Sequence, residues 1–340
     1  MLRRLAALLL LVLGALPAVA AAQPADVCPL RSLAGDAGVH IGAFYGEGSH
    51  TAEFRTVHAR EFDSLTAGLY WATTEPARDD FRFQSADIAV GFAESNGQRV
   101  RGHPLVWGRL ALPAWVNALT EADDLRAAMT THIRAIMTRY AGRITQYDVV
   151  NEPLTLFGAA GDTDGLESYV FLRLLGPDYI AEALRAAHAA DPEAKLFVNE
   201  FGVERPGPKQ ERFFRLVSDL LRAGVPLHGV GFQTHVALPI LGGPPPTAGE
   251  IEAAIRRFTA LGVVVELTEM DVVLPDRSAC QLDWQRGVYQ GYLRACGRVA
   301  GCTGLTVWSI SDAYTWIRDF PERWLEKDPE KAWKNPPPCE

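Results

Sequence analysis

The sequence predicts an α/β fold, a single-domain (β/α)8 TIM barrel. Strand-like apolar runs alternate with amphipathic helical stretches along the chain, in the order that a parallel barrel requires. No Ser/Gly-rich or Pro-rich linker divides residues 23–340, and these roughly 318 residues are enough for one large barrel with a substantial core. We therefore expect residues 23–340 to form one barrel domain.

Eight runs rich in apolar, often β-branched, residues are predicted to be the barrel strands. In chain order they are residues 41–44, 64–71, 100–107, 146–152, 195–201, 229–236, 263–272 and 304–310. Between them, residues 122–140, 178–190 and 210–223 carry apolar side chains at helical spacing. Thr247 and Glu250 form a capping-box pattern that predicts the start of a further helix. A doubly wound fold is disfavoured because no phosphate-binding glycine loop opens a helix.

Residues 1–22 have the pattern of a signal peptide. Arg3 and Arg4 precede the apolar run of residues 5–13, and small residues from Ala18 onward offer a cleavage site before Gln23. The apolar run is shorter than the ~20 residues that a membrane-spanning helix needs. We expect this leader to be removed and the mature chain to be secreted or periplasmic, without membrane association and as a monomer.

Five cysteines fit an oxidising compartment. Cys296 and Cys302 flank a short Gly-containing turn before a predicted strand, so we expect them to form a local disulfide. Cys28 and Cys339 could join the chain ends and leave Cys280 free, although the sequence does not determine that pairing. The cysteine and histidine spacings do not repeat as ligand pairs, which argues against a zinc site.

The charge of the chain limits the class of partner. The formal net charge is −8 and no basic stripe or cluster compensates it, so we do not expect the protein to bind nucleic acid. A sugar is a more natural partner than a phosphate for such a chain. The expected ligand is therefore a polysaccharide or an oligosaccharide.

Two glutamates are the strongest candidates for catalysis. Glu152 ends the fourth predicted strand and Glu269 ends the seventh, at the carboxyl ends where catalytic groups of a barrel gather. A single glutamate at such a place is more often a cap or an ion-pair partner, but these two strands face each other across the barrel mouth. Carboxylates ~5 to 5.5 Å apart would cleave a glycosidic bond with retention of anomeric configuration.

This chemistry requires the two carboxyl groups in different states. Ionised Glu269 would attack the anomeric carbon, while Glu152, buried beside that negative charge, would stay protonated and protonate the leaving oxygen. Glu152 would then ionise and deprotonate the water that hydrolyses the glycosyl-enzyme. The mechanism requires no metal and no organic cofactor.

Several motifs, in the same order along the chain, resemble glycoside hydrolase family ten, whose principal members are retaining endo-β-1,4-xylanases. They are residues 102–107 (GHPLVW), 147–152 (YDVVNE), 174–180 (LLGPDYI), 196–200 (LFVNE), 231–235 (GFQTH), 268–271 (TEMD) and 307–312 (VWSISD), followed by Trp316. The resemblance covers nearly the whole mature chain. It implies that Glu152 is the acid/base and Glu269 the nucleophile.

The same resemblance implies substrate-binding and supporting roles for further residues. Asn151 would bond the sugar 2-hydroxyl, and His235 would orient Glu269 with Asp271 and Gln233 in the surrounding hydrogen-bond network. The residues implied to line the sugar at the cleavage point are His103, Trp107, Trp308 and Trp316. A tryptophan at a strand end is often core and a lone histidine is often structural, but their shared position at the predicted mouth favours function.

The chain departs from the family pattern on the glycone side of the cleavage point. Family xylanases carry Thr-Pro-Glu-Asn-x-Met-Lys-Trp after the second strand, whereas residues 66–73 of this chain read TAGLYWAT. Gly68, Leu69 and Ala72 therefore replace a Glu, an Asn and a Lys that hold sugar. The usual His-x-Gln after the third strand is also absent, since residues 108–113 read GRLALP.

Because these polar residues are absent, the sequence does not determine the identity of the substrate. Tyr70, Trp71 and Arg109 would either build a more apolar glycone site or only fill the vacated space. The expected function is that of a secreted retaining hydrolase of xylanase type acting on xylan or xylo-oligosaccharides. The alternatives are a β-glycosidase of the same mechanism with another β-glycan or a plant glycoside as substrate, and a carbohydrate-binding protein without turnover.

Overall fold

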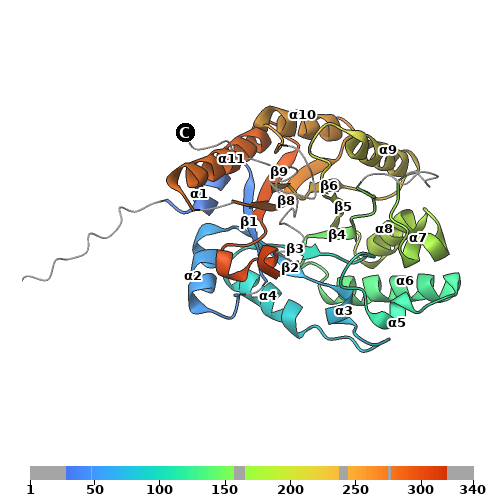
Figure 1. Ribbon diagram of the computed structural model, residues 1–340. Helices are drawn as coiled ribbons and strands as arrows, with labels where there is room; N and C mark the ends of the chain where they lie inside the picture. Colours follow the sequence, from blue (N-terminus) through green and yellow to red (C-terminus); the bar gives the residue numbers. More distant parts are fainter. Residues whose placement is uncertain (1–27, 47, 157–164, 237–243, 275–276, 320–340) are drawn as a thin grey trace, which may run out of the picture.

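A closed barrel of parallel strands ringed by helices is seen in the computed structural model, which describes residues 28–46, 48–156, 165–236, 244–274 and 277–319 (Figure 1). The strands are β1 (His40–Phe44), β2 (Ser64–Gly68), β3 (Arg99–His103), β4 (Gln146–Asn151), β5 (Lys195–Glu200), β6 (Gly229–Phe232), β7 (His235–Val236), β8 (Val264–Val272) and β9 (Cys302–Val307). Their order is β6-β5-β4-β3-β2-β1-β9-β8-β7, and a further pairing of β6 with β8 closes the sheet.

The short strands β6 and β7 are two pieces of one barrel strand, because both pair in parallel with β8. Gln233 and Thr234 separate them. Thr234 has a φ of 54°, a left-handed conformation that is rare for a β-branched residue. When β6 and β7 are counted as one strand, the barrel has eight strands, at the eight predicted positions. The (β/α)8 barrel is therefore confirmed.

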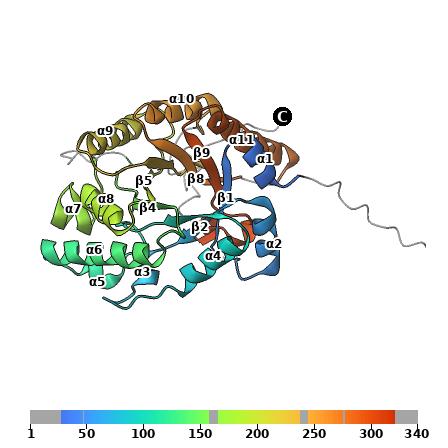
Figure 2. The same cartoon turned by 180° about the vertical axis from the view of Figure 1, so that it is seen from behind.

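Helices cover the outside of the barrel in views from the front and from behind (Figure 1, Figure 2). They are α1 (Leu30–Asp36), α2 (Ala52–Glu61), α3 (Trp71–Thr74), α4 (Gln84–Ser95), α5 (Ala114–Asn117), α6 (Ala122–Arg139), α7 (Val170–Leu175), α8 (Tyr179–Ala190), α9 (Pro208–Arg222), α10 (Ala248–Thr259) and α11 (Ala279–Gly297), with 3-10 turns η2 (Asp312–Tyr314) and η3 (Trp316–Asp319) near the end. The three predicted helical stretches correspond to α6, α8 and α9.

Local sequence explains where these helices begin and which face they bury. Helix α9 starts with Pro208, whose fixed φ and missing N–H suit the first helical position. Its buried Phe213, Val217 and Leu220 recur at helical spacing and belong to the hydrophobic core. At the start of α10, both hydrogen bonds of the predicted capping box between Thr247 and Glu250 are present.

The barrel interior contains a buried ionic network. Arg101 on β3 has a side chain that is only 1% exposed, and its guanidinium binds Asp148 on β4 and Glu266 on β8. The distance from Arg101 Nη1 to Glu266 Oε2 is 2.7 Å, and Gln146 donates to the same oxygen over 2.8 Å. Burial opposes ionisation of Asp148, but Arg101 and His103 outweigh it and hold the Asp148 pKa below its usual range.

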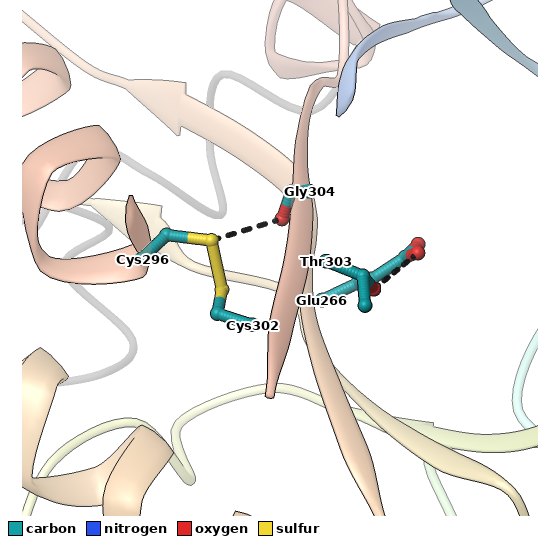
Figure 3. Close-up of a disulfide and its surroundings, with 5 residues drawn as sticks. All are labelled: Glu266, Cys296, Cys302, Thr303 and Gly304. Atoms are coloured by element: carbon teal, nitrogen blue, oxygen red, sulfur yellow. Dashed lines mark hydrogen bonds between the residues drawn. A yellow bond between two sulfur atoms is a disulfide. The ribbon is translucent and has the colours of Figure 1, made fainter. Parts of the chain in front are cut away.

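The predicted disulfide between Cys296 and Cys302 is confirmed at the turn between α11 and β9 (Figure 3). The suggested pairing of Cys28 with Cys339 is wrong. Within the described residues Cys28 is free and exposed, whereas Cys280, which was expected to be free, is disulfide-bonded. Spacing alone could not decide this, because the pairing of cysteines far apart in the sequence depends on the fold.

The predicted leader, residues 1–22, lies outside the described part of the chain, so its removal stays a prediction. Among the helices that the structure describes, none combines the length and the apolar character that crossing a bilayer requires.

Replacing Arg101 with Met should lower the free energy of unfolding by about 3–5 kcal/mol, because Asp148 and Glu266 would stay buried without their cation. Urea unfolding followed by circular dichroism measures the loss. Arg222→Met is the matched control, since the Arg222 side chain is 74% exposed and pairs with Asp219 at the surface. The control should change stability by less than about 0.5 kcal/mol, and equal losses in both variants would contradict this role of the buried network.

Candidate active site

Glu152 follows the last residue of β4, at the carboxyl end of the barrel. Its φ of 51° is a left-handed conformation that is uncommon for residues other than glycine and is often found at functional sites. Its N–H donates to the carbonyl of Asn199 on β5 over 2.9 Å. Gln233 Nε2 donates to Glu152 Oε1 over 3.1 Å, and Arg109 Nη1 lies 3.6 Å from Oε2. The carboxyl group is therefore held in place with its side chain 11% exposed.

Glu269 lies on β8, which continues to Val272 in agreement with the predicted run of residues 263–272, so the glutamate lies three residues before the end of the strand. The pairing of β8 with β9 shifts register between Leu267 and Met270, and such an irregularity re-aims nearby side chains. Asn199 Nδ2 donates to Glu269 Oε1 over 2.6 Å, and His235 Nε2 lies 3.4 Å from Oε2. Both oxygens of this buried carboxylate thus face a nitrogen that can donate to them.

His235 is held in turn by a second carboxylate. Its Nδ1 bonds to Asp271 Oδ1 over 3.0 Å, and Trp316 Nε1 donates to Asp271 Oδ2 over 2.8 Å. Burial alone would lower the pKa of His235, but Asp271 and Glu269 outweigh burial and raise it to about 10. An imidazolium donates from both ring nitrogens, so His235 can orient Glu269 and Asp271 together.

Asn199 on β5 is a site residue that the sequence analysis did not single out. Its buried amide group donates to Asn151 Oδ1 over 2.8 Å as well as to Glu269. Asn151 also accepts from Gln233 Nε2 over 3.3 Å. A hydrogen-bond chain therefore runs from Glu269 through Asn199, Asn151 and Gln233 to Glu152. The signal that could have found Asn199 is the Asn-Glu pair ending the fifth predicted strand, which matches the Asn-Glu pair ending the fourth.

His103 ends β3 and lies among aromatic rings. Its Nδ1 bonds to Asp148 Oδ2 over 2.9 Å and lies 3.8 Å from Glu269 Oε1. The ring centroids of Trp308 and Trp107 lie 5.0 and 6.4 Å from the His103 centroid. Trp107 Nε1 is buried and has no hydrogen-bond partner among the described residues, so it is a donor available to a ligand.

The structure brings together all ten predicted site residues at one end of the barrel, but it separates the three residues considered for the glycone side. Tyr70 and Arg109 lie at the site. Trp71 does not: it is 2% exposed, its ring stacks on His132 of α6 at 4.0 Å, and its Nε1 donates to Glu75 over 2.9 Å. A glycone-site role for Trp71 is therefore wrong, because packing against α6 takes its ring into the core.

Comparison with known proteins gives a family match and close structural relatives. A sequence model described as "Glycosyl hydrolase family 10" matches residues 29–332. "Endo-1,4-beta-xylanase 1" of Humicola insolens is 38% identical over 310 residues, which cover 88% of this chain and 70% of that protein. "Endo-1,4-beta-xylanase" of Agaricus bisporus is 34% identical, covering 86% and 87%. Xylanase 10B from Thermotoga petrophila RKU-1, solved with xylobiose, superimposes with a TM-score of 0.79 at 28% identity, covering 88% and 90%.

The raised pKa of His235 predicts a pH-dependent contribution to stability. The folded state favours the charged ring, so the contribution is complete below the ordinary pKa of 6.5 and is lost as pH rises from there through about 10. Its upper size is roughly 5 kcal/mol, since one pKa unit corresponds to about 1.4 kcal/mol. Urea unfolding of wild type and His235→Gln across this window should show a difference that shrinks as pH rises. A difference independent of pH would contradict the assignment.

Proposed function

Because the chain belongs to glycosyl hydrolase family 10, a family of retaining glycoside hydrolases, we propose that it is an exported xylanase-like enzyme that cleaves xylan or xylo-oligosaccharides. One observation carries the proposal: two glutamates, Glu152 directly after β4 and the buried Glu269 on β8, are joined by a single hydrogen-bond chain at the carboxyl end of the barrel. Similarity to endo-1,4-beta-xylanases supports the substrate class, and the pattern of residues 1–22 supports export.

In this proposal Glu269 is the nucleophile. Asn199 and the His235 imidazolium stabilise its ionised form and orient it, so that one oxygen can attack the anomeric carbon. Glu152 first gives its proton to the leaving oxygen and then takes a proton from the water that hydrolyses the glycosyl-enzyme. Gln233, which donates to Glu152, keeps that carboxyl group in reach for both steps. Two displacements at one carbon return its original configuration.

The sugar at the cleavage point would be bound by the polar and aromatic groups around the two glutamates. Asn151 would hold the 2-hydroxyl, a contact that can strengthen in the transition state. The unpartnered Nε1 of Trp107 would donate to a hydroxyl, and His103 would line the same position. The rings of Trp308 and Trp316 would form its walls, because aromatic faces pack well on the apolar faces of sugars.

A second candidate is a β-glycosidase of the same mechanism whose substrate is another β-glycan or a plant glycoside. The observation that favours it is the end of β2, where Gly68, Leu69 and Ala72 offer no polar side chain, and Leu69 is fully buried. A buried hydroxyl without a partner costs on the order of 1–3 kcal/mol, which disfavours a second xylose on the glycone side. Binding without turnover is disfavoured because both glutamates and their supporting residues are in place.

The experiment that separates the two candidates is a product profile of the mature protein. Glucuronoxylan, arabinoxylan, mixed-linkage glucan and an aryl β-xyloside are each incubated with the enzyme, and products are identified by chromatography and mass spectrometry. Release of xylose or short xylo-oligosaccharides supports the first candidate. Turnover of another β-glycoside, with no action on any xylose polymer or xyloside, would replace it with the second.

Glu269→Ala should abolish turnover of every substrate, because no carboxylate remains to attack the anomeric carbon. Glu152→Ala should lower kcat on xylan by roughly 10²- to 10⁴-fold, the usual size of a general-acid contribution, but spare aryl glycosides whose leaving groups need no protonation. Added azide should rescue the Glu152 variant and give a β-glycosyl azide. Glu53→Ala, an exposed glutamate in the first turn of α2, is the control and should leave activity unchanged. An α-azide, or full activity of either site variant on xylan, would refute the two roles.

A further inference from the structure

The rings of Phe44 and Tyr70 converge over Gly68, beside the proposed cleavage point. A Cβ built on Gly68 would lie 3.1 Å from Tyr70 Cε2 and 3.8 Å from Phe44 Cε2. Gly68 is the last residue of β2 and lies opposite His103 in the ladder between β2 and β3. The two rings therefore occupy space next to the first sugar, and a larger residue at position 68 would displace the Tyr70 ring.

Both rings join a larger group that we call the aromatic wall, made of Phe44, Tyr70, Trp107 and Trp308. Phe44 stacks on Trp308 with 4.4 Å between ring centroids and 20° between planes, so no sugar fits between them. The Tyr70 centroid lies 6.1 Å from that of Trp107 and 5.9 Å from that of His103, to which its ring is edge-on. The aromatic wall thus partly surrounds His103.

The Tyr70 ring is half-buried at the site. Burial raises the pKa of its phenol, and the charges of Glu269 and Glu152 raise it further. The phenol therefore stays neutral. A ring in this position takes up volume that substrate would otherwise fill.

Two backbone N–H groups at the end of β2 are already paired. The Leu69 N–H donates to the His103 carbonyl over 2.6 Å, and the Ala72 N–H donates to the Ala111 carbonyl over 2.8 Å. The side chains of Leu69 and Ala72 carry no hydrogen-bonding group. Leu69 and Ala72 therefore provide neither a free N–H nor a polar side chain to the hydroxyls of a second sugar on the glycone side.

We infer that the aromatic wall closes the glycone side behind the first sugar, so that the enzyme removes single sugar units from the non-reducing end of its substrate. The inference rests on the proposed function and specifies its mode of action. A substrate extended by a second sugar on that side would collide with Tyr70, and Leu69 and Ala72 would offer its hydroxyls no side-chain partner. A substrate whose non-reducing end stops at the first sugar avoids both costs.

Wild-type enzyme tests this directly with xylohexaose that carries ¹⁸O at its reducing end. A site for one glycone sugar predicts unlabelled xylose and labelled xylopentaose as the main first products, detected by mass spectrometry at low conversion. Unlabelled xylobiose or xylotriose as the main first product would overturn the inference.

A second test compares kcat/KM for an aryl β-xylobioside with kcat/KM for the matching aryl β-xyloside. The ratio should be one or less in wild type and should rise at least tenfold in the double variant Phe44→Ala/Tyr70→Ala. Phe81→Ala is the matched control, because the Phe81 ring stacks on Phe83 away from the site, and it should leave the ratio unchanged. Circular dichroism and thermal unfolding establish that the variants fold. An unchanged ratio in a folded double variant would overturn the inference, and if that variant does not fold, the labelled xylohexaose decides alone.

Failure of the proposed substrate is distinguishable from failure of the aromatic wall. If neither xyloside is cleaved while another aryl β-glycoside is, the xylan proposal fails. The same ratio is then measured with the monosaccharide and disaccharide glycosides of that sugar. A ratio of one or less supports closure of the glycone side, and a ratio above ten overturns it.

Discussion

A carboxylate inside a closed barrel must be paired, and this constraint connects the core of the molecule to its active site. Buried ionised groups are tolerated only where opposite charges and hydrogen bonds compensate their lost hydration. Such groups form a chain in which each side chain lies within 4 Å of the next. In order, they are Glu266, Arg101, Asp148, His103, Glu269, His235 and Asp271. Because Glu269 belongs to this network, the interactions that hold the barrel interior also fix the proposed nucleophile before substrate arrives, which is the arrangement that electrostatic stabilisation of a transition state requires.

Most of the barrel could be predicted because each strand is a short apolar run and the helices carry apolar residues at helical spacing. The two glutamates could be predicted because they follow such runs at the carboxyl ends of strands. The break between β6 and β7 could not, since the left-handed Thr234 has no local signal. The direction in which the Trp71 side chain points and the role of Asn199 depend on residues far away in the sequence. Both could therefore be found only in the folded structure.

The reaction and its specificity are built on different parts of the barrel. The groups that would perform the chemistry lie on or directly after β4, β5, β7 and β8. The departures from the family pattern lie at the end of β2 and after β3, where Gly68, Leu69 and Ala72 stand at positions that are polar in that pattern and where the Tyr70 ring lies edge-on to His103. Because the two sets come from separate strands, the substrate-binding side can change while the hydrogen-bond chain between the glutamates stays intact.

The stacking of Phe44 on Trp308 has a consequence for how the protein acquires its activity. Phe44 ends β1 and Trp308 follows β9, and the pairing of these two strands joins segments about 260 residues apart in the chain. Contacts between such distant segments form late, because the entropy of closing a long loop must be overcome first. A chain in which β9 had not yet paired would already contain both glutamates, but its substrate site would lack Trp308. The appearance of substrate selectivity would therefore mark the moment at which the two ends of the sheet meet.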